Sequence, residues 1–164
     1  MLDAEYIKET IVEADDRYFL IPSRQHGATH RKLFCRLPGW HTDRRCVKVD
    51  ILVPPTLGLP EIYSYDMDLI EGIPVMPLFD LLVMKLQGWW DHRTSTRTDF
   101  RAKAPADVGD VLALLDRAET ENVSYLDQGY SHEEEFMDRA EILVHRFVKV
   151  YRGRMRWRGL GFPV

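Results

Sequence analysis

The chain has 164 residues, a formal net charge of −4 at pH 7 and an apolar fraction of 45%. This length is sufficient for a domain with a substantial buried core, and the composition is that of an ordinary globular protein. The acidic balance argues against a protein whose whole surface coats nucleic acid. No apolar run reaches the roughly 20 residues of a membrane span, and the early acids Asp3 and Glu5 argue against a signal peptide. We therefore expect no membrane partner.

The two cysteines, Cys35 and Cys46, both fall in strand-like segments. Small proteins that are stabilised by disulfides carry a higher density of cysteine than this chain does. We therefore expect free, buried thiols in a reducing compartment, and an intracellular location that is either cytoplasmic or nuclear.

The first half of the chain predicts one helix followed by a small sheet. Apolar residues recur at helical spacing over residues 3–14. Strand-like segments then follow at residues 17–22, 31–38 and 46–54. The links between the strands are too short for crossover helices, so the sheet should be largely antiparallel. Prolines and a glycine after the third segment predict an irregular connection.

The third strand-like segment, CVKVDILVP, contains one residue that strands disfavour. Alternation predicts that Val47 and Val49 face the core, which leaves Asp50 on the opposite face. An aspartate beside a core needs a cation or another polar partner. An ion pair with Arg36, Arg44 or Lys48 would give Asp50 a role in strand register alone.

The second half of the chain predicts packed helices. Helical patterns cover residues 76–92 and 105–119, and the sequence Ser131–Glu134 resembles a capping box that opens a third, long helix. The C-terminal stretch YRGRMRWRGLGF alternates arginines with Gly, Met and Trp. In extended form this stretch would place its arginines on one side, as a terminal strand or arm on the body of the protein or as a nucleic-acid-binding tail.

These elements predict an α+β fold in which a small, largely antiparallel sheet precedes packed helices. We expect a single domain over residues 1–164, with a sheet-containing lobe at 1–60, a helical lobe at 73–152 and an arginine-rich tail at 153–164. A cleft between the two lobes is the expected position of a ligand site.

Two stretches resemble the nucleotidyltransferase superfamily with the polymerase-β-type fold. They are VKVDILVP and IPVMPLFDLLVMKLQGWWDHRTSTRTDFRAKAPADVGDVLALL, and the resemblance extends from about Tyr18 to Leu115. It is strongest to fungal nucleotidyltransferase-like proteins and to abortive-infection toxin nucleotidyltransferases. In this family three strand-borne carboxylates hold Mg²⁺ ions, which bind the triphosphate and activate the attacking hydroxyl. The resemblance implies that Asp50 is the third of these carboxylates, a catalytic residue and metal ligand.

The chain departs from the family pattern at the other two carboxylates. The family carries a Gly-Ser turn and a D-x-D pair upstream of the position that Asp50 matches, and this sequence has neither there. The pair Asp66 and Asp68 has the D-x-D spacing but lies downstream of Asp50. We therefore expect either an N-terminally shortened version of a larger protein or a family fold without its chemistry.

A second group of polar residues lies in the stretch KLQGWWDHRTSTRTDFRAK. Lys85 falls on the apolar side of its helix, where lysine is unexpected unless it pairs or extends toward solvent. The resemblance implies that Lys85 faces the active-site cleft and that Asp107 and Asp110, on one face of the next helix, help to position it. Between the helices, cations concentrate in a dozen residues and predict contacts with the phosphates of a nucleotide or an RNA. These cations are His92, Arg93, Arg97, Arg101 and Lys103.

The alternative for this basic loop is a charged surface segment that pairs with Asp91 and Asp99. Three functions therefore remain open from the sequence. The first is a degenerate or incomplete nucleotidyltransferase-fold protein that binds a nucleotide or another phosphate-bearing ligand near Asp50 and Lys85. The second is an active, Mg²⁺-dependent nucleotidyltransferase when complete, and the third is an RNA-binding module that uses residues 92–103 and the C-terminal arginines. An exposed sheet edge also predicts self-association.

Overall fold

The computed structural model describes residues 3–24, 27–37, 45–128 and 132–164. It divides into two compact units, Met1–Leu59 and Pro60–Val164. The first unit contains an antiparallel sheet and the second is mainly helical. The predicted α+β class is thus confirmed.

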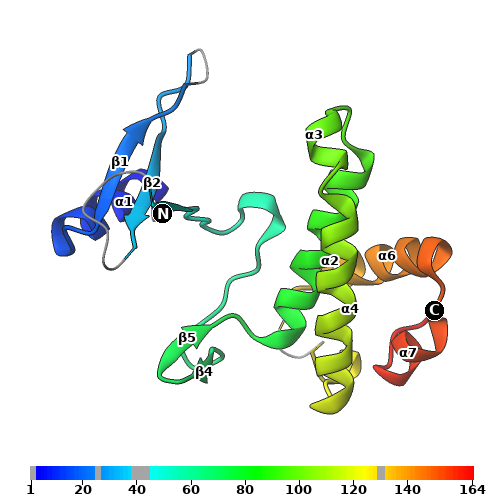
Figure 1. Cartoon of the computed structure of the whole chain (residues 1–164). Helices are drawn as coiled ribbons and strands as arrows, with labels where there is room; N and C mark the ends of the chain where they lie inside the picture. Colours follow the sequence, from blue (N-terminus) through cyan, green and yellow to red (C-terminus); the bar gives the residue numbers. More distant parts are fainter. Residues whose placement is uncertain (1–2, 25–26, 38–44, 129–131) are drawn as a thin grey trace. The chain divides into compact units, whose positions relative to one another are not determined.

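The first unit places one helix before a three-stranded sheet (Figure 1). The helix is α1 (Ala4–Ala14), and the strands are β1 (Tyr18–Pro22), β2 (Arg31–Arg36) and β3 (Cys46–Val49). The strand order is β1-β2-β3, and both pairings are antiparallel as predicted. Leu33, at the centre of the middle strand, is fully buried.

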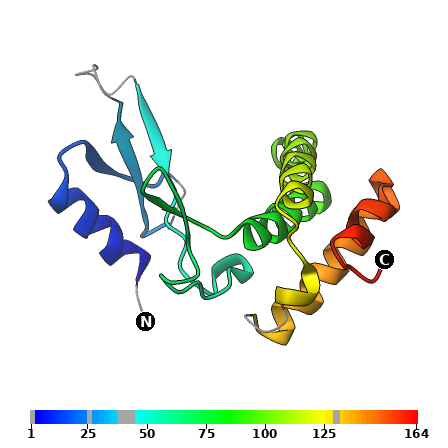
Figure 2. The ribbon, with the colours of Figure 1, turned by 90° about the horizontal axis from the view of Figure 1, so that it is seen from below.

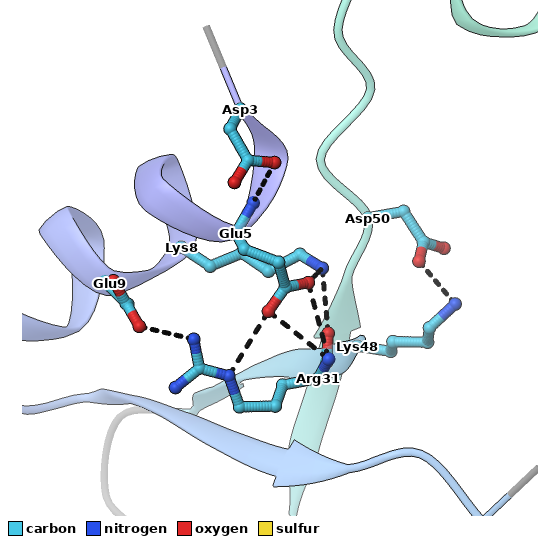
Figure 3. Close-up of polar contacts among 7 residues, drawn as sticks. All are labelled: Asp3, Glu5, Lys8, Glu9, Arg31, Lys48 and Asp50. Carbon is cyan, nitrogen blue, oxygen red and sulfur yellow. Dashed lines mark hydrogen bonds and ion pairs between the residues drawn. The ribbon is translucent and has the colours of Figure 1, made fainter. Parts of the chain in front are cut away.

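Strand β3 is shorter than the sequence predicted, because side chains of α1 take the place of a longer ladder. Backbone bonds from Arg36 to Arg17 and from Ser23 to His30 show that the even-numbered residues of β2 and its flanks direct their backbone groups toward β1. The N–H and C=O of Arg31 therefore point toward β3. The carboxylate of Glu5 accepts from that N–H at 3.3 Å, and Nζ of Lys8 donates to that carbonyl at 2.8 Å (Figure 3).

Two expectations about the third strand are therefore wrong. β3 ends at Val49, so Asp50 follows the strand instead of lying within it. The prediction that Val47 faces a core is also wrong, because 45% of this residue is exposed. A short outer strand beside a single helix has too few neighbouring side chains to bury the predicted valine stripe.

The second unit begins with a hairpin that the sequence pattern did not predict. After the 3₁₀ turn η1 (Thr56–Gly58), the chain forms β4 (Asp68–Ile70) and β5 (Ile73–Val75), paired antiparallel. The two residues between them, Glu71 and Gly72, both have positive φ, at 52° and 80°. That conformation is typical of a tight hairpin turn, which the prediction of an irregular connection did not include.

The remainder of the second unit is a group of packed helices. Helix α2 (Leu78–Thr94) packs against α4 (Ala104–Thr120) and against α6 (Glu134–Tyr151), as Figures 1 and 2 show. Short helices connect or follow them: α3 (Thr98–Arg101), α5 (Tyr125–Gln128) and α7 (Arg154–Gly159). Apolar residues of α2, α4, α6 and the C-terminal segment form one core. The three predicted helices are therefore confirmed.

Two details of the helical prediction are wrong or lie outside the described residues. The helical pattern over residues 105–119 predicts that Leu112 lies on the apolar side of α4 with Val111 and Leu115, but Leu112 is 40% exposed while the other two are buried. Residue Glu133 is the N-cap of α6, and its side chain makes no capping bond. Ser131, the first residue of the predicted capping box, is outside the described residues.

The C-terminal segment is helical, which corrects the predicted extended arm. Arg152 and Gly153 have positive φ, at 60° and 82°, and end α6, so the chain turns into α7. Trp157 is then only 1% exposed, while Met155 is 74% exposed. An extended chain would have placed these two side chains on one face. The helix directs Trp157 into the core and leaves Met155 exposed.

No helix among the described residues combines the length and the apolar composition that crossing a bilayer requires. Both cysteines are free thiols, as expected, but each is only partly buried, so the expectation that they are buried is wrong.

We predict that Leu82→Ala lowers the free energy of unfolding by about 2–5 kcal/mol. Leu82 is fully buried in the core of the second unit, so the substitution leaves a cavity. Urea denaturation followed by circular dichroism measures the change. The control is Ile142→Ala on α6, where the side chain is 49% exposed. It should change the stability by no more than about 0.5 kcal/mol, and an equal loss in both variants would contradict this description of the core.

Candidate functional site

Asp50 follows β3 in the first unit and forms an ion pair with Lys48 (Figure 3). Its side chain is 66% exposed. This is the local pairing with Lys48 that the sequence left open as an alternative to a metal-binding role. Lys85 belongs to the second unit, so the expectation of a cleft shared by Asp50 and Lys85 stays a prediction.

In the second unit, α2 and α4 bring together four of the polar residues that the sequence singled out. Nζ of Lys85 donates to Oδ2 of Asp110 at 2.7 Å. Nδ1 of His92 lies 2.6 Å from Oδ2 of Asp107. On each helix the two residues share a face, at spacings of seven and three. Of the two acids of α4 that were expected to position Lys85, Asp110 contacts it, whereas Asp107 pairs with His92 instead.

The two pairs differ in their exposure to solvent. The side chains of Lys85 and Asp110 are 40% and 51% exposed, whereas those of His92 and Asp107 are 22% and 13% exposed. A carboxylate accepts, so Nδ1 of His92 is the protonated nitrogen, and in the neutral ring Nε2 is an acceptor. Asp107 thereby fixes both the tautomer and the orientation of the imidazole. Asp110 holds the Lys85 ammonium at the surface, where an incoming anion can reach it.

The loop around α3 gathers cations about one aromatic ring. The guanidinium of Arg97 lies 4.2 Å from the centre of the Phe100 ring, and Nζ of Lys103 lies 5.0 Å from the same centre. The ring of His92 contacts Phe100 edge-on, with centroids 5.5 Å apart. We refer to Arg97, Phe100 and Lys103 as the Phe100 cluster. Phe100 therefore connects the loop cations to the His92–Asp107 pair.

The loop cations differ in how far their charges are already paired. Arg97 pairs with Asp99 at 2.6 Å, and this guanidinium lowers the pKa of the Asp99 carboxyl. Arg101 donates to the backbone carbonyls of Ser95 and Thr96. Arg93 is exposed in the last turn of α2. Within the described residues, no carboxylate pairs with Arg93, Arg101 or Lys103, so the loop retains positive charge.

A second polar site, which the sequence pattern did not predict, lies where α2 and α6 begin. Nε2 of His132 lies 2.7 Å from Oδ1 of Asp80, and Nδ1 lies 3.1 Å from the carbonyl oxygen of Gln128. The side chains of His132 and Asp80 are only 9% and 2% exposed. Phe136 stacks on the imidazole with centroids 5.0 Å apart. An aspartate in the otherwise apolar stretch LFDLLVM was the available signal.

The partners of His132 determine its charge. A carbonyl oxygen only accepts, so Nδ1 must donate to Gln128, and Nε2 then donates to the carboxylate of Asp80. This arrangement favours the imidazolium, with a proton on each ring nitrogen, beside a carboxylate. The hydrogen bond to Asp80 raises the pKa of His132, and burial opposes this effect only in part. Because neither nitrogen is left as a base, we assign the pair a structural role.

A cavity of about 120 Å³ opens beside this pair. Its polar lining includes Glu61, Asp66 and Gln128 in addition to the pair itself. Asp66 also contributes to the raised pKa of His132 through its negative charge. Asp66, which the sequence offered as half of a D-x-D pair, therefore lies at this cavity, while Asp68 lies in β4.

The described residues do not fit the predicted metal site. Among them, no group of three or more His, Cys, Asp or Glu side chains is arranged to hold a metal ion. The carboxylate of Asp50 is engaged by the Lys48 ammonium. A two-metal centre requires several clustered carboxylates, so one paired aspartate is an insufficient donor set.

Comparisons of the chain with models of protein families, with curated proteins and with solved structures found no match.

We predict that the stability of the second unit falls as the pH rises through the raised pKa of His132. The folded-state pKa lies above the unfolded value of about 6.5, so the contribution of the pair is complete below that pH and is lost above the folded-state pKa. Urea unfolding at a series of pH values measures the loss, and an NMR titration of His132 locates it.

The variant His132→Gln should remove this pH dependence, while His145→Gln, at an exposed position of α6, should retain it. An unchanged dependence in His132→Gln would show that other groups are responsible.

Proposed function

We propose that this chain is a nucleotidyltransferase-like protein that binds a nucleotide or another phosphate-bearing ligand through α2, α3 and α4. The supporting observation is the pairing of Lys85 with Asp110 and of His92 with Asp107, beside the Phe100 cluster. The sequence resemblance implied a lysine on α2 positioned by acids of the following helix, and this geometry is compatible with that role.

The charges in this region favour an anionic ligand. An exposed ion pair contributes little stability, about 0–1 kcal/mol, so a phosphate can replace Asp110 or Asp99 as the partner of a cation at little cost. Arg and Lys bind phosphate oxygens through charge-assisted hydrogen bonds, which are stronger than neutral ones. Lys85, Arg93, Arg97 and Lys103 are the proposed phosphate contacts, while Asp107, Asp110 and His92 support them.

An active nucleotidyltransferase is the second candidate, in a form of the protein that supplies further carboxylates. In that form Asp50 is the catalytic residue and metal position that the resemblance implied, and Mg²⁺ is the cofactor. The further carboxylates must come from outside the described residues, since Asp50 alone does not form a metal centre. For the chain as given, we propose binding without turnover.

An RNA-binding module is the third candidate, supported by the cations around Phe100. Fewer arginines of the C-terminal segment are available to RNA than the sequence suggested. Arg156 pairs with Asp116 and Glu119 of α4, and Arg158 donates to the carbonyl of Val164. Only Arg152 and Arg154 of that segment are left as proposed RNA contacts, together with residues 92–103.

Self-association is a further proposal, based on the first unit. Within the described residues, β1 and β3 are the outer strands of its sheet, and outer strands present unpaired backbone groups. Light scattering over a range of protein concentrations tests it, and a monomer at every concentration contradicts it.

We predict that a fluorescent ATP analogue binds the chain and that Lys85→Ala and Arg97→Ala each weaken this binding by about tenfold, the effect of losing one charged hydrogen bond. Binding should also weaken as the salt concentration rises. Fluorescence anisotropy measures the affinity. The matched control is Arg117→Ala, which removes a cation of α4 that pairs with Glu121. Equal losses in all three variants, or no binding, would contradict the proposed site.

We also predict that the 164-residue chain transfers no nucleotide from Mg²⁺- or Mn²⁺-nucleoside triphosphates to RNA or protein. The described residues lack the clustered carboxylates that two-metal transfer requires. Incubation with labelled triphosphates, cellular RNA and cellular protein measures transfer. Metal-dependent labelling that Asp50→Asn abolishes would establish the enzyme and overturn this prediction.

A further inference from the structure

The β4–β5 hairpin exposes apolar side chains on both of its faces. Leu69 is 72% exposed, Ile70 61% and Ile73 63%. Tyr63 and Tyr65, just before the hairpin, stack with ring centroids 5.4 Å apart and are 53% and 79% exposed. Single exposed apolar residues are ordinary, but a contiguous group of them is typical of an interaction surface. In Figure 1 the hairpin lies to one side of α2 and α4.

The hairpin also has one strand edge that can accept a further strand. Its two-residue turn makes Ile70 and Ile73 the hydrogen-bonded closing pair, so the next pair, Leu69 and Pro74, directs its backbone groups outward. Pro74 has no N–H, which makes the outer edge of β5 a poor partner. Leu69 presents both an N–H and a C=O at the outer edge of β4. No third strand pairs with β4 within the described residues.

The hairpin and its flanking residues carry only negative charges. Residues 60–77 contain four acids, Glu61, Asp66, Asp68 and Glu71, and no Lys, Arg or His. All four acids are exposed. A symmetric pairing with a second copy would place the acids of two β4 strands close together, and like charges across strands are destabilising. The same negative charge disfavours a nucleic acid. The partner that these charges favour is therefore a basic protein segment.

We propose that the outer edge of β4 binds an extended segment of a partner protein in which basic and apolar residues alternate. Backbone bonds to Leu69 would add the segment as a third strand, a known mode of peptide recognition. On one face of the hairpin its apolar side chains would lie beside Leu69, and on the other face its basic side chains would lie beside Asp68, with Glu71 adding negative charge at the turn. This interaction does not depend on the proposed nucleotide site.

Three labelled seven-residue peptides test the proposal with the full chain: one alternating Lys and Val, one alternating Glu and Val, and a Lys–Val peptide with a central Pro. Fluorescence anisotropy at low salt measures binding. Only the uninterrupted Lys–Val peptide should bind well, because the acidic peptide is repelled and proline prevents strand pairing. Equal binding of the proline-containing peptide would show that attraction between charges accounts for the interaction, and it would overturn the proposed strand pairing.

Two double variants with the same change in net charge test whether the peptide binds at the edge of β4. Asp68→Lys with Glu71→Lys should weaken binding of the Lys–Val peptide by about fivefold or more, since two exposed attractions become repulsions. The control, Glu13→Lys with Asp127→Lys, reverses two exposed acids on α1 and α5 and should leave the affinity unchanged. Leu69→Ser should weaken binding without any change of charge. No binding of the Lys–Val peptide, or equal losses in both double variants, would refute the proposal.

Discussion

The burial of α2 against α4 and α6 is the constraint on which the second unit depends. Five apolar side chains of this one helix enter the shared core: Phe79, Leu82, Val83, Leu86 and Trp89. Polar residues of α2 must then lie at the margins of these contacts or find buried partners. Asp80 is buried and pairs with His132. Lys85 and His92 lie beside α4 and pair with its acids Asp110 and Asp107.

The same constraint explains why two different polar sites occur on one helix. Asp80 and His132 are almost fully enclosed, and both nitrogens of the imidazole are engaged, so this pair holds the start of α2 to the start of α6. Lys85 and Asp110 remain about half exposed, and an exposed ion pair can exchange its partner for a ligand. Burial thus separates a structural pair from a pair that is available for binding.

In the first unit, side chains of a helix compete with a strand for the same backbone groups. Glu5 and Lys8 satisfy the N–H and C=O of Arg31 that a longer β3 would have bonded. Lys8 is itself only 9% exposed, and its ammonium reaches both the Glu5 carboxylate and this carbonyl. The end of β3, and with it the exposed position of Asp50 beside Lys48, follows from this substitution.

The sequence by itself determined the α+β class, the antiparallel sheet and the three long helices, because hydrophobic period and short links are local properties of the chain. The spacing of Asp107 and Asp110 likewise placed them on one face of α4. The tertiary structure alone decided that β3 ends before Asp50 and that YRGRMRWRGLGF is helical. In both segments the local alternation was compatible with a strand, but the α1 side chains bonded to Arg31 end the first and the burial of Trp157 favours a helix in the second. Only packing revealed the pairing of Asp80 with His132, since 52 residues separate them and no local pattern connects them.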